Sequence, residues 1–128
     1  MTEMLKIARA ALERYHDVEV DEDGSVTFAH GGVVCAVQGV QLEEGLPVLN
    51  ITCVVAWDLP PESDVPSRVA LGVGEGLFGT PRVIRGERGW DVTLRYAFPA
   101  AGLDEKAMGT LLMLVVGSAS SMRAELTA

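Results

Sequence analysis

The sequence predicts an α+β domain in which helices pack on an antiparallel sheet, in the order α-β-β-β-α-β-β-α. Two observations support this class. Apolar residues recur at helical spacing in some segments and at every second position in others. Turn signals separate the alternating segments, as they do in hairpins. The length of 128 residues suits one domain, so we expect a single α+β domain over residues 1–128.

Residues 2–15 are expected to form an amphipathic helix with one buried stripe. Thr2 is a plausible cap for its first turn, because a threonine hydroxyl accepts a hydrogen bond from a free backbone N–H. The stripe recurs at three- and four-residue spacing and consists of Met4, Leu5, Ala8, Ala11, Leu12 and Tyr15.

After this helix, apolar residues recur at every second position, which is typical of strands. The acidic segment 17–20 indicates a short extra strand, and Asp23-Gly24 indicates a turn before a strand from Ser25. After a second turn, segments 33–42 and 48–59 predict a long hairpin. On its second strand we expect one uniformly apolar face and one mixed face. The apolar face consists of Leu49, Ile51, Cys53, Val55 and Trp57.

The remaining segments predict two helices around one hairpin. Pro60-Pro61 ends the preceding strand, and we expect a helix over residues 64–78 with Ser63 as its cap and Pro66 in its first turn. Three glycines weaken this prediction, each by about 1 kcal/mol relative to alanine. Segments 82–87 and 90–98 predict a hairpin whose buried face holds Trp90, Val92, Leu94, Tyr96 and Phe98. A final helix over 103–126 buries Met108, Leu111, Leu112, Val115, Ala119, Met122 and Leu126.

Charge limits the classes of partner. The net charge is −8, and residues 1–64 hold three bases against twelve acids, whereas residues 65–128 hold seven bases against six acids. An acidic surface repels phosphate backbones and anionic lipids, so we expect neither nucleic acid nor membrane as a partner. The start of the chain lacks a signal-peptide pattern, and the apolar run 111–116 is short and flanked by polar residues. We therefore expect a cytoplasmic protein.

Three features carry a resemblance to a known family: Asp23-Gly24 before the first full strand, Val-Leu-Asn-Ile at 48–51, and Trp-Asp-Val-Thr-Leu at 90–94. With this element order on an acidic chain, the sequence resembles the type III secretion chaperone-like fold. Within that fold it is most similar to YbjN-type bacterial proteins, including their actinobacterial members. The resemblance implies a curved antiparallel sheet with helices packed on one side, often in a dimer.

The resemblance also implies a function. Secretion chaperones of this shape hold an unfolded stretch of cargo protein along hydrophobic surface grooves, and YbjN-type proteins are thought to have a regulatory or chaperone-like role. The chain departs from secretion chaperones in its glycine-rich middle helix, a region that such chaperones use for dimer contact.

No motif in the sequence supports catalysis, a cofactor or a metal site. Residues 74–79 match the dinucleotide pattern G-x-G-x-x-G, but a helix precedes them and a strand follows, the reverse of what phosphate binding needs. Residues 19–24 imitate the start of a calcium loop, yet position twelve of that loop is His30. Cys35 and Cys53 are expected to be buried neighbours on adjacent strands, and the two histidines have no ligand spacing.

We therefore expect a non-enzymatic protein- or peptide-binding module that binds a second copy of itself and an unidentified partner. Apolar surface on the mixed sheet face and the middle helix would form the site, through Val48, Val54, Val69, Val73 and Leu77. Core packing is the alternative explanation for each of these residues. Arg82 and Arg85 either keep a strand edge from unwanted pairing or recognise an acidic peptide or the acidic half of a second copy. The alternative functions are a small-molecule sensor and a structural subunit of a larger assembly.

Overall fold

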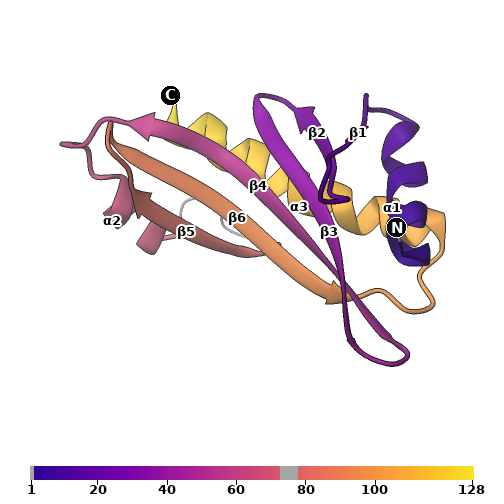
Figure 1. Cartoon of the computed structure of the whole chain (residues 1–128). Coiled ribbons are helices and arrows are strands. Elements are labelled where there is room, and N and C mark those ends of the chain that lie inside the picture. The colour runs from indigo at the N-terminus through magenta and orange to yellow at the C-terminus, as the bar shows by residue number, and fades with distance from the viewer. Residues whose placement is uncertain (1, 73–77) are drawn as a thin grey trace.

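The computed structural model describes residues 2–72 and 78–128 and confirms the α+β class (Figure 1). Within these residues a six-stranded antiparallel sheet has the strand order β1-β2-β3-β4-β6-β5. The elements in chain order are α1 (Glu3–Glu13), β1 (Glu19–Val20), β2 (Val26–His30), β3 (Val33–Glu43), β4 (Leu46–Leu59), α2 (Val65–Ala70), β5 (Thr80–Arg85), β6 (Trp90–Pro99) and α3 (Glu105–Leu126).

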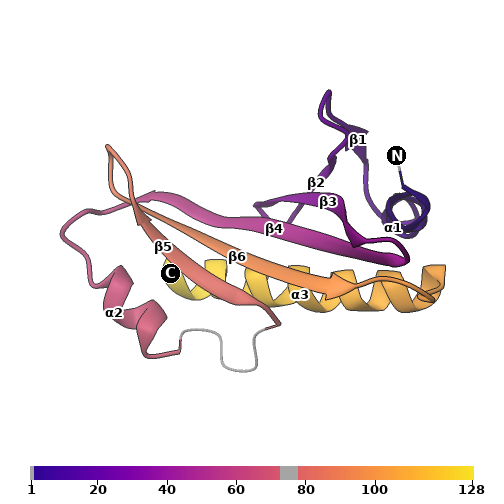
Figure 2. The ribbon, with the colours of Figure 1, turned by 60° about the horizontal axis from the view of Figure 1, so that its bottom comes forward.

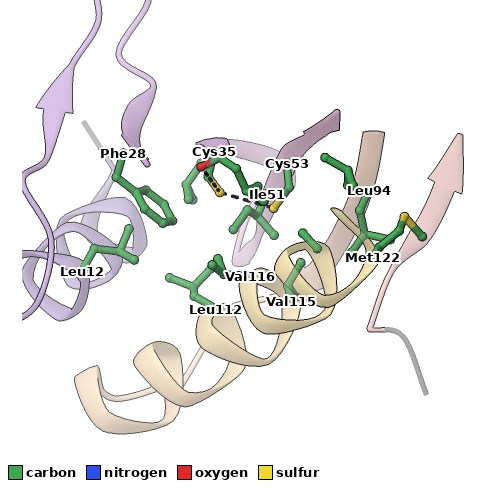
Figure 3. Close-up of a cluster of buried hydrophobic side chains, with 14 of the residues drawn as sticks. Leu12, Phe28, Cys35, Ile51, Cys53, Leu94, Leu112, Val115, Val116 and Met122 are labelled. Atoms are coloured by element: carbon green, nitrogen blue, oxygen red, sulfur yellow. Dashed lines mark hydrogen bonds between the residues drawn. The ribbon is translucent and has the colours of Figure 1, made fainter. Parts of the chain in front are cut away.

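Helices α1 and α3 cover one face of the sheet. Figure 2 shows α3 running beneath β4 and β6, and α1 packs against α3 and β3. Odd-numbered residues from 33 to 37 of β3 and from 49 to 55 of β4 point to this side and are buried, as two-residue periodicity requires. The core between the helices and the sheet includes Leu12, Ile51, Leu94, Leu112 and Met122 (Figure 3).

Side-chain caps fix the start of both long helices. Thr2 Oγ1 accepts a hydrogen bond from Leu5 N at 3.3 Å, which confirms the expected cap of α1. The helix ends at Glu13, however, so Tyr15 lies beyond it and is 84% exposed rather than part of the buried stripe. Asp104 Oδ1 accepts a hydrogen bond from Ala107 N at 2.8 Å at the start of α3.

The buried side of α3 is close to the predicted one. Six of the seven expected residues are buried, whereas Leu111 is only partly buried. Val116 was not expected in the core and is fully buried. Because 3.6 residues per turn do not repeat evenly, a 22-residue helix shifts its buried stripe sideways along its length.

The expected apolar face of β4 ends before Trp57. Leu49 to Val55 alternate as predicted, but the register with β6 shifts between Val54 and Ala56 and again before Leu59. Such a bulge turns the following side chains to other directions. Ala56 is therefore buried, and Trp57 is 49% exposed, with the Arg123 guanidinium 5.4 Å from its ring centre.

The predicted middle helix is too long. Helix α2 ends at Ala70, and Gly72 has a φ of +93°, a backbone conformation that ends a helix. Asp64 occupies the N-cap position, whereas Ser63 Oγ donates to Pro60 O at 2.6 Å. Pro66 lies in the first turn as expected.

Candidate protein-binding surface

One face of the sheet carries no helix among the described residues. We call the side opposite α1 and α3 the open sheet face (Figure 2). Two cross-strand pairs place apolar side chains on it, namely Val34 beside Val54 and Val40 beside Val48. Val34 is 48% exposed and Val40 49% exposed, while Val48 and Val54 are half-buried. The open sheet face is thus apolar at two places and accessible to a partner.

The centre of the open sheet face is polar and ordered by hydrogen bonds. Arg95 Nε donates to Asn50 Oδ1 at 2.9 Å, and Gln38 Nε2 donates to Ser25 Oγ at 3.0 Å. Asn50 is only 7% exposed, so its side-chain contact with Arg95 compensates for its burial. A partner on this face would meet fixed polar groups between the two valine pairs.

The structure separates the seven residues that the sequence suggested for partner binding. Val48 and Val54 lie on the open sheet face as expected. Val69 is 9% exposed and belongs to the core beneath β5, so its assignment to a free surface is wrong. Val73 and Leu77 lie outside the described residues.

Arg82 and Arg85 are both exposed on β5 but point to opposite sides. Arg82 pairs with Thr93 and points to the open sheet face, since alternate residues of a strand share a face. Arg85 pairs with Trp90 and points to the helix side, where its guanidinium lies 5.0 Å from the Trp90 ring centre. The two arginines therefore share a strand edge but not a sheet face.

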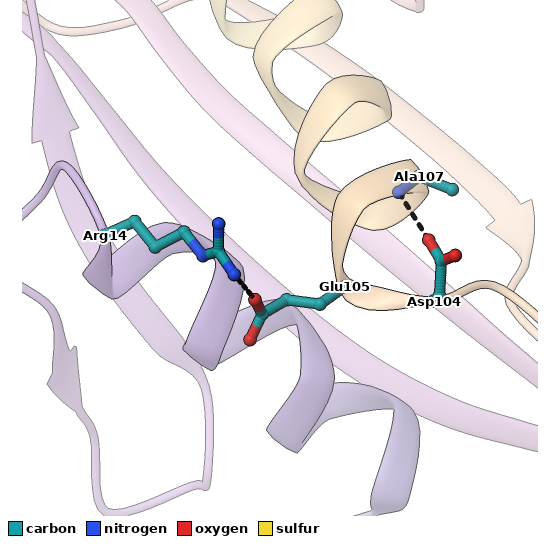
Figure 4. A network of polar contacts seen from close by, with 4 residues as sticks. All are labelled: Arg14, Asp104, Glu105 and Ala107. Carbon is teal, nitrogen blue, oxygen red and sulfur yellow. Dashed lines mark hydrogen bonds and ion pairs between the residues drawn. The ribbon is translucent and has the colours of Figure 1, made fainter.

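A groove of about 730 Å³ lies between α1 and α3. Its walls are mostly apolar and include Leu12 and Met113. The two helices lie close at Gly109, where an added Cβ would make an ordinary van der Waals contact of 3.4 Å with the Ala11 Cβ. Arg14 and Glu105 form an ion pair at one end (Figure 4). This ion pair is partly exposed, so it adds little to stability. Sequence reasoning missed this groove because no motif marks where two helices diverge.

The two cysteines are buried neighbours, as predicted. Cys35 pairs with Cys53 across β3 and β4, and their Sγ atoms are 3.5 Å apart (Figure 3). The hydrogen bond to the Cys53 thiol and burial raise the pKa of Cys35 above its ordinary value. A thiol held neutral in this way is a poor nucleophile.

Two histidines distant in the sequence meet in the structure. His16 follows α1 and His30 ends β2, and His16 Nε2 lies 3.0 Å from His30 Nδ1. The His16 ring also packs edge-on against Phe28, with ring centres 5.1 Å apart. Their spacing of fourteen residues gives no periodic signal, so sequence analysis did not pair them. Among the described residues, no group of three or more His, Cys, Asp or Glu side chains is placed to hold a metal ion.

The segment that imitates a calcium loop forms a tight turn. Ser25 N donates to Asp23 Oδ1 at 3.0 Å, which holds the pKa of Asp23 below its ordinary value, and Gly24 has a φ of +86°. The acids here support the turn geometry expected of aspartate and glycine. The glycines at 74 and 76 of the dinucleotide-like pattern lie outside the described residues.

Helix α3 is long and apolar enough to cross a membrane by length and composition alone, contrary to the expectation for residues 111–116. In this fold, the apolar composition of α3 is explained by its place in the core. Seven of its residues, among them Met108, Leu112 and Met122, are buried, as in the core helix of a domain.

Comparisons with known proteins give a likeness in structure and none in sequence. No protein-family model matches the sequence, and no curated protein sequence matches it. Among solved structures, the chain is similar to the Yersinia pestis type III secretion chaperone SycH, which was crystallised in complex with a stable fragment of YscM2. The TM-score is 0.47 and the sequence identity 12%, over 93% of this chain and 98% of that chain. A likeness at this level concerns the arrangement of elements and not what this chain binds.

Proposed function

We propose that this chain is a non-enzymatic protein- or peptide-binding module with a chaperone-like or regulatory role, of the kind suggested for YbjN-type proteins. We further propose that it works as a homodimer in the cytoplasm. The observation that carries the proposal is the open sheet face, which presents Val34, Val40, Val48 and Val54 and is covered by no helix of the described part of the chain.

The physical basis is the hydrophobic effect. Fully burying an exposed valine is worth about 1.5–3 kcal/mol, so the half-exposed Val34 and Val40 would each gain about 1 kcal/mol in a complex. This attraction is not directional, and it therefore suits partners of varied sequence. The hydrogen-bonded Asn50 and Arg95 between the valine pairs add polar contacts that orient the partner.

A charge introduced on the open sheet face tests the proposal. We expect Val34→Asp with Val54→Asp to abolish dimerisation in sedimentation velocity and to reduce suppression of aggregation of a denatured model protein. Ser121→Asp with Ala124→Asp, at two exposed positions of α3, adds the same two charges; it is the matched control and should change neither result. If the double variant dimerises and protects as the wild type does, the open sheet face is not the site.

The groove between α1 and α3 favours a second candidate function, a small-molecule sensor. Its volume of about 730 Å³ falls within the roughly 300–1,000 Å³ typical of ligand sites. Thermal-shift screening against metabolites tests this alternative. A saturable rise in melting temperature that Gly109→Leu removes would support it, and the absence of any such ligand would favour protein binding.

A further inference from the structure

Strand β5 is the edge of the sheet among the described residues, because it pairs with β6 alone. We propose that this edge binds an extended acidic segment of a partner protein by strand addition. The proposal rests on the protein-binding function above and names the partner's chemistry and its place on the fold.

The backbone of β5 is arranged to accept another strand. Gly86 N donates to Gly89 O at 2.8 Å at the hairpin end. Hydrogen-bonded and non-hydrogen-bonded pairs alternate along antiparallel strands, so Ile84 and Arg82 bond to β6. The N–H groups of Val83 and Arg85 therefore point outward. Position 81 also faces outward, where the missing N–H of a proline does not interrupt the bonds to β6.

The side chains along this edge select acidic partners. Arg82 lies on the open sheet face and Arg85 on the helix side, so an added strand would meet an arginine on each of its faces. Arg88 in the following turn is exposed as well. Carboxylates three positions apart, which lie on opposite faces of an extended strand, would form charge-assisted hydrogen bonds with these guanidinium groups.

A second copy of this chain fits the edge poorly. Two β5 strands paired with each other would bring Arg82 and Arg85 against like charges. The acidic opposite edge, β1, is only two residues long (Glu19–Val20), and pairing it with β5 would give a head-to-tail contact without the self-complementary symmetry of a two-fold dimer. Complementary charge therefore points to a separate acidic partner. The opposing explanation is that the arginines only prevent edge pairing.

Fluorescence anisotropy with labelled hexapeptides separates these explanations. We expect a valine hexapeptide with glutamate at its second and fifth positions, one on each face of the added strand, to bind the wild-type protein. The same peptide with lysine at these two positions should not bind. Arg82→Glu with Arg85→Glu should weaken binding of the glutamate peptide by about tenfold or more. The control, Lys6→Glu with Lys106→Glu, changes the net charge equally at exposed sites away from β5 and should weaken binding much less.

A backbone variant separates strand addition from simple charge attraction. Val83→Pro removes one outward N–H and leaves the bonds to β6 intact, but it also removes a side chain that packs against the core. Val83→Ala loses the same packing and keeps the N–H, so Val83→Pro should weaken peptide binding several-fold more than Val83→Ala does. Equal weakening by the β5 and the control charge pairs, or no binding of the glutamate peptide at all, would overturn the proposal. Because the open sheet face is untouched in these variants, such a failure leaves dimerisation and aggregation suppression as independent tests of the proposed function.

Discussion

Because of the contact between Cys35 and Cys53, we expect the stability of the fold to decrease at alkaline pH. The hydrogen bond that the Cys35 thiol donates to Cys53 Sγ and the burial of the site raise the pKa of Cys35 in the folded state. In the unfolded chain the thiol ionises near its ordinary pKa of about 8.5. The folded state thus retains a proton that the unfolded state loses. Stability is fully present below the ordinary pKa and falls as the pH rises above it.

The expected loss is about 1.4 kcal/mol of unfolding free energy for each pH unit above the ordinary thiol pKa. Urea unfolding under reducing conditions, from about pH 7 to about pH 10, measures this slope. Cys35→Ala removes the thiol, so the variant should lose less stability over the alkaline range than the wild type. If the two proteins give parallel curves throughout, Cys35 ionises alike in both states and its environment has been misjudged.

Four further substitutions test packing and backbone geometry by urea unfolding. Leu112→Ala should cost about 2–5 kcal/mol because the side chain is fully buried, and a value below 1 kcal/mol would contradict its place in the core. Gly89→Ala should cost about 3 kcal/mol or more, since the new Cβ would overlap the Leu59 carbonyl oxygen, whereas Gly24→Ala meets no atom within 4 Å and should cost about 1–2 kcal/mol. Gly117→Ala on α3 has open space around it and should stabilise the protein by up to about 1 kcal/mol; destabilisation would indicate a contact there.

The order and type of the elements followed from periodicity, because burial on one side enforces spacing in both helices and strands. The same rule placed Cys35 beside Cys53, since two strands of a hairpin with matching parity share a face. It also placed Val48 and Val54 on the side away from the helices. All of these correct predictions concern residues close together in the sequence or two strands joined by one turn.

The sequence predictions fail where the backbone departs from regular strand or helix geometry. They also fail where contacts between distant elements decide whether a residue is buried. The bulge after Val54 exposes Trp57, and no residue pattern marks that bulge in the sequence. Helix α2 ends at Ala70, and Val69 packs beneath β5 because α2 lies against that strand. The contact of His16 with His30 needs the end of α1 and the end of β2 to meet, which spacing alone does not encode.

The side chains of Arg82 and Arg85 point in opposite directions, so they distinguish the two candidate surfaces, the open sheet face and the β5 edge. Arg82 stands where the open sheet face meets the β5 edge, so a partner on either surface comes within its reach. Arg85 is held over Trp90 on the helix side and can meet only a partner that pairs with the edge. Loss of Arg82 should therefore affect binding to both surfaces, and loss of Arg85 to one. Comparing the loss of Arg82 with the loss of Arg85 thus distinguishes a partner that lies on the open sheet face from one that adds a strand to β5.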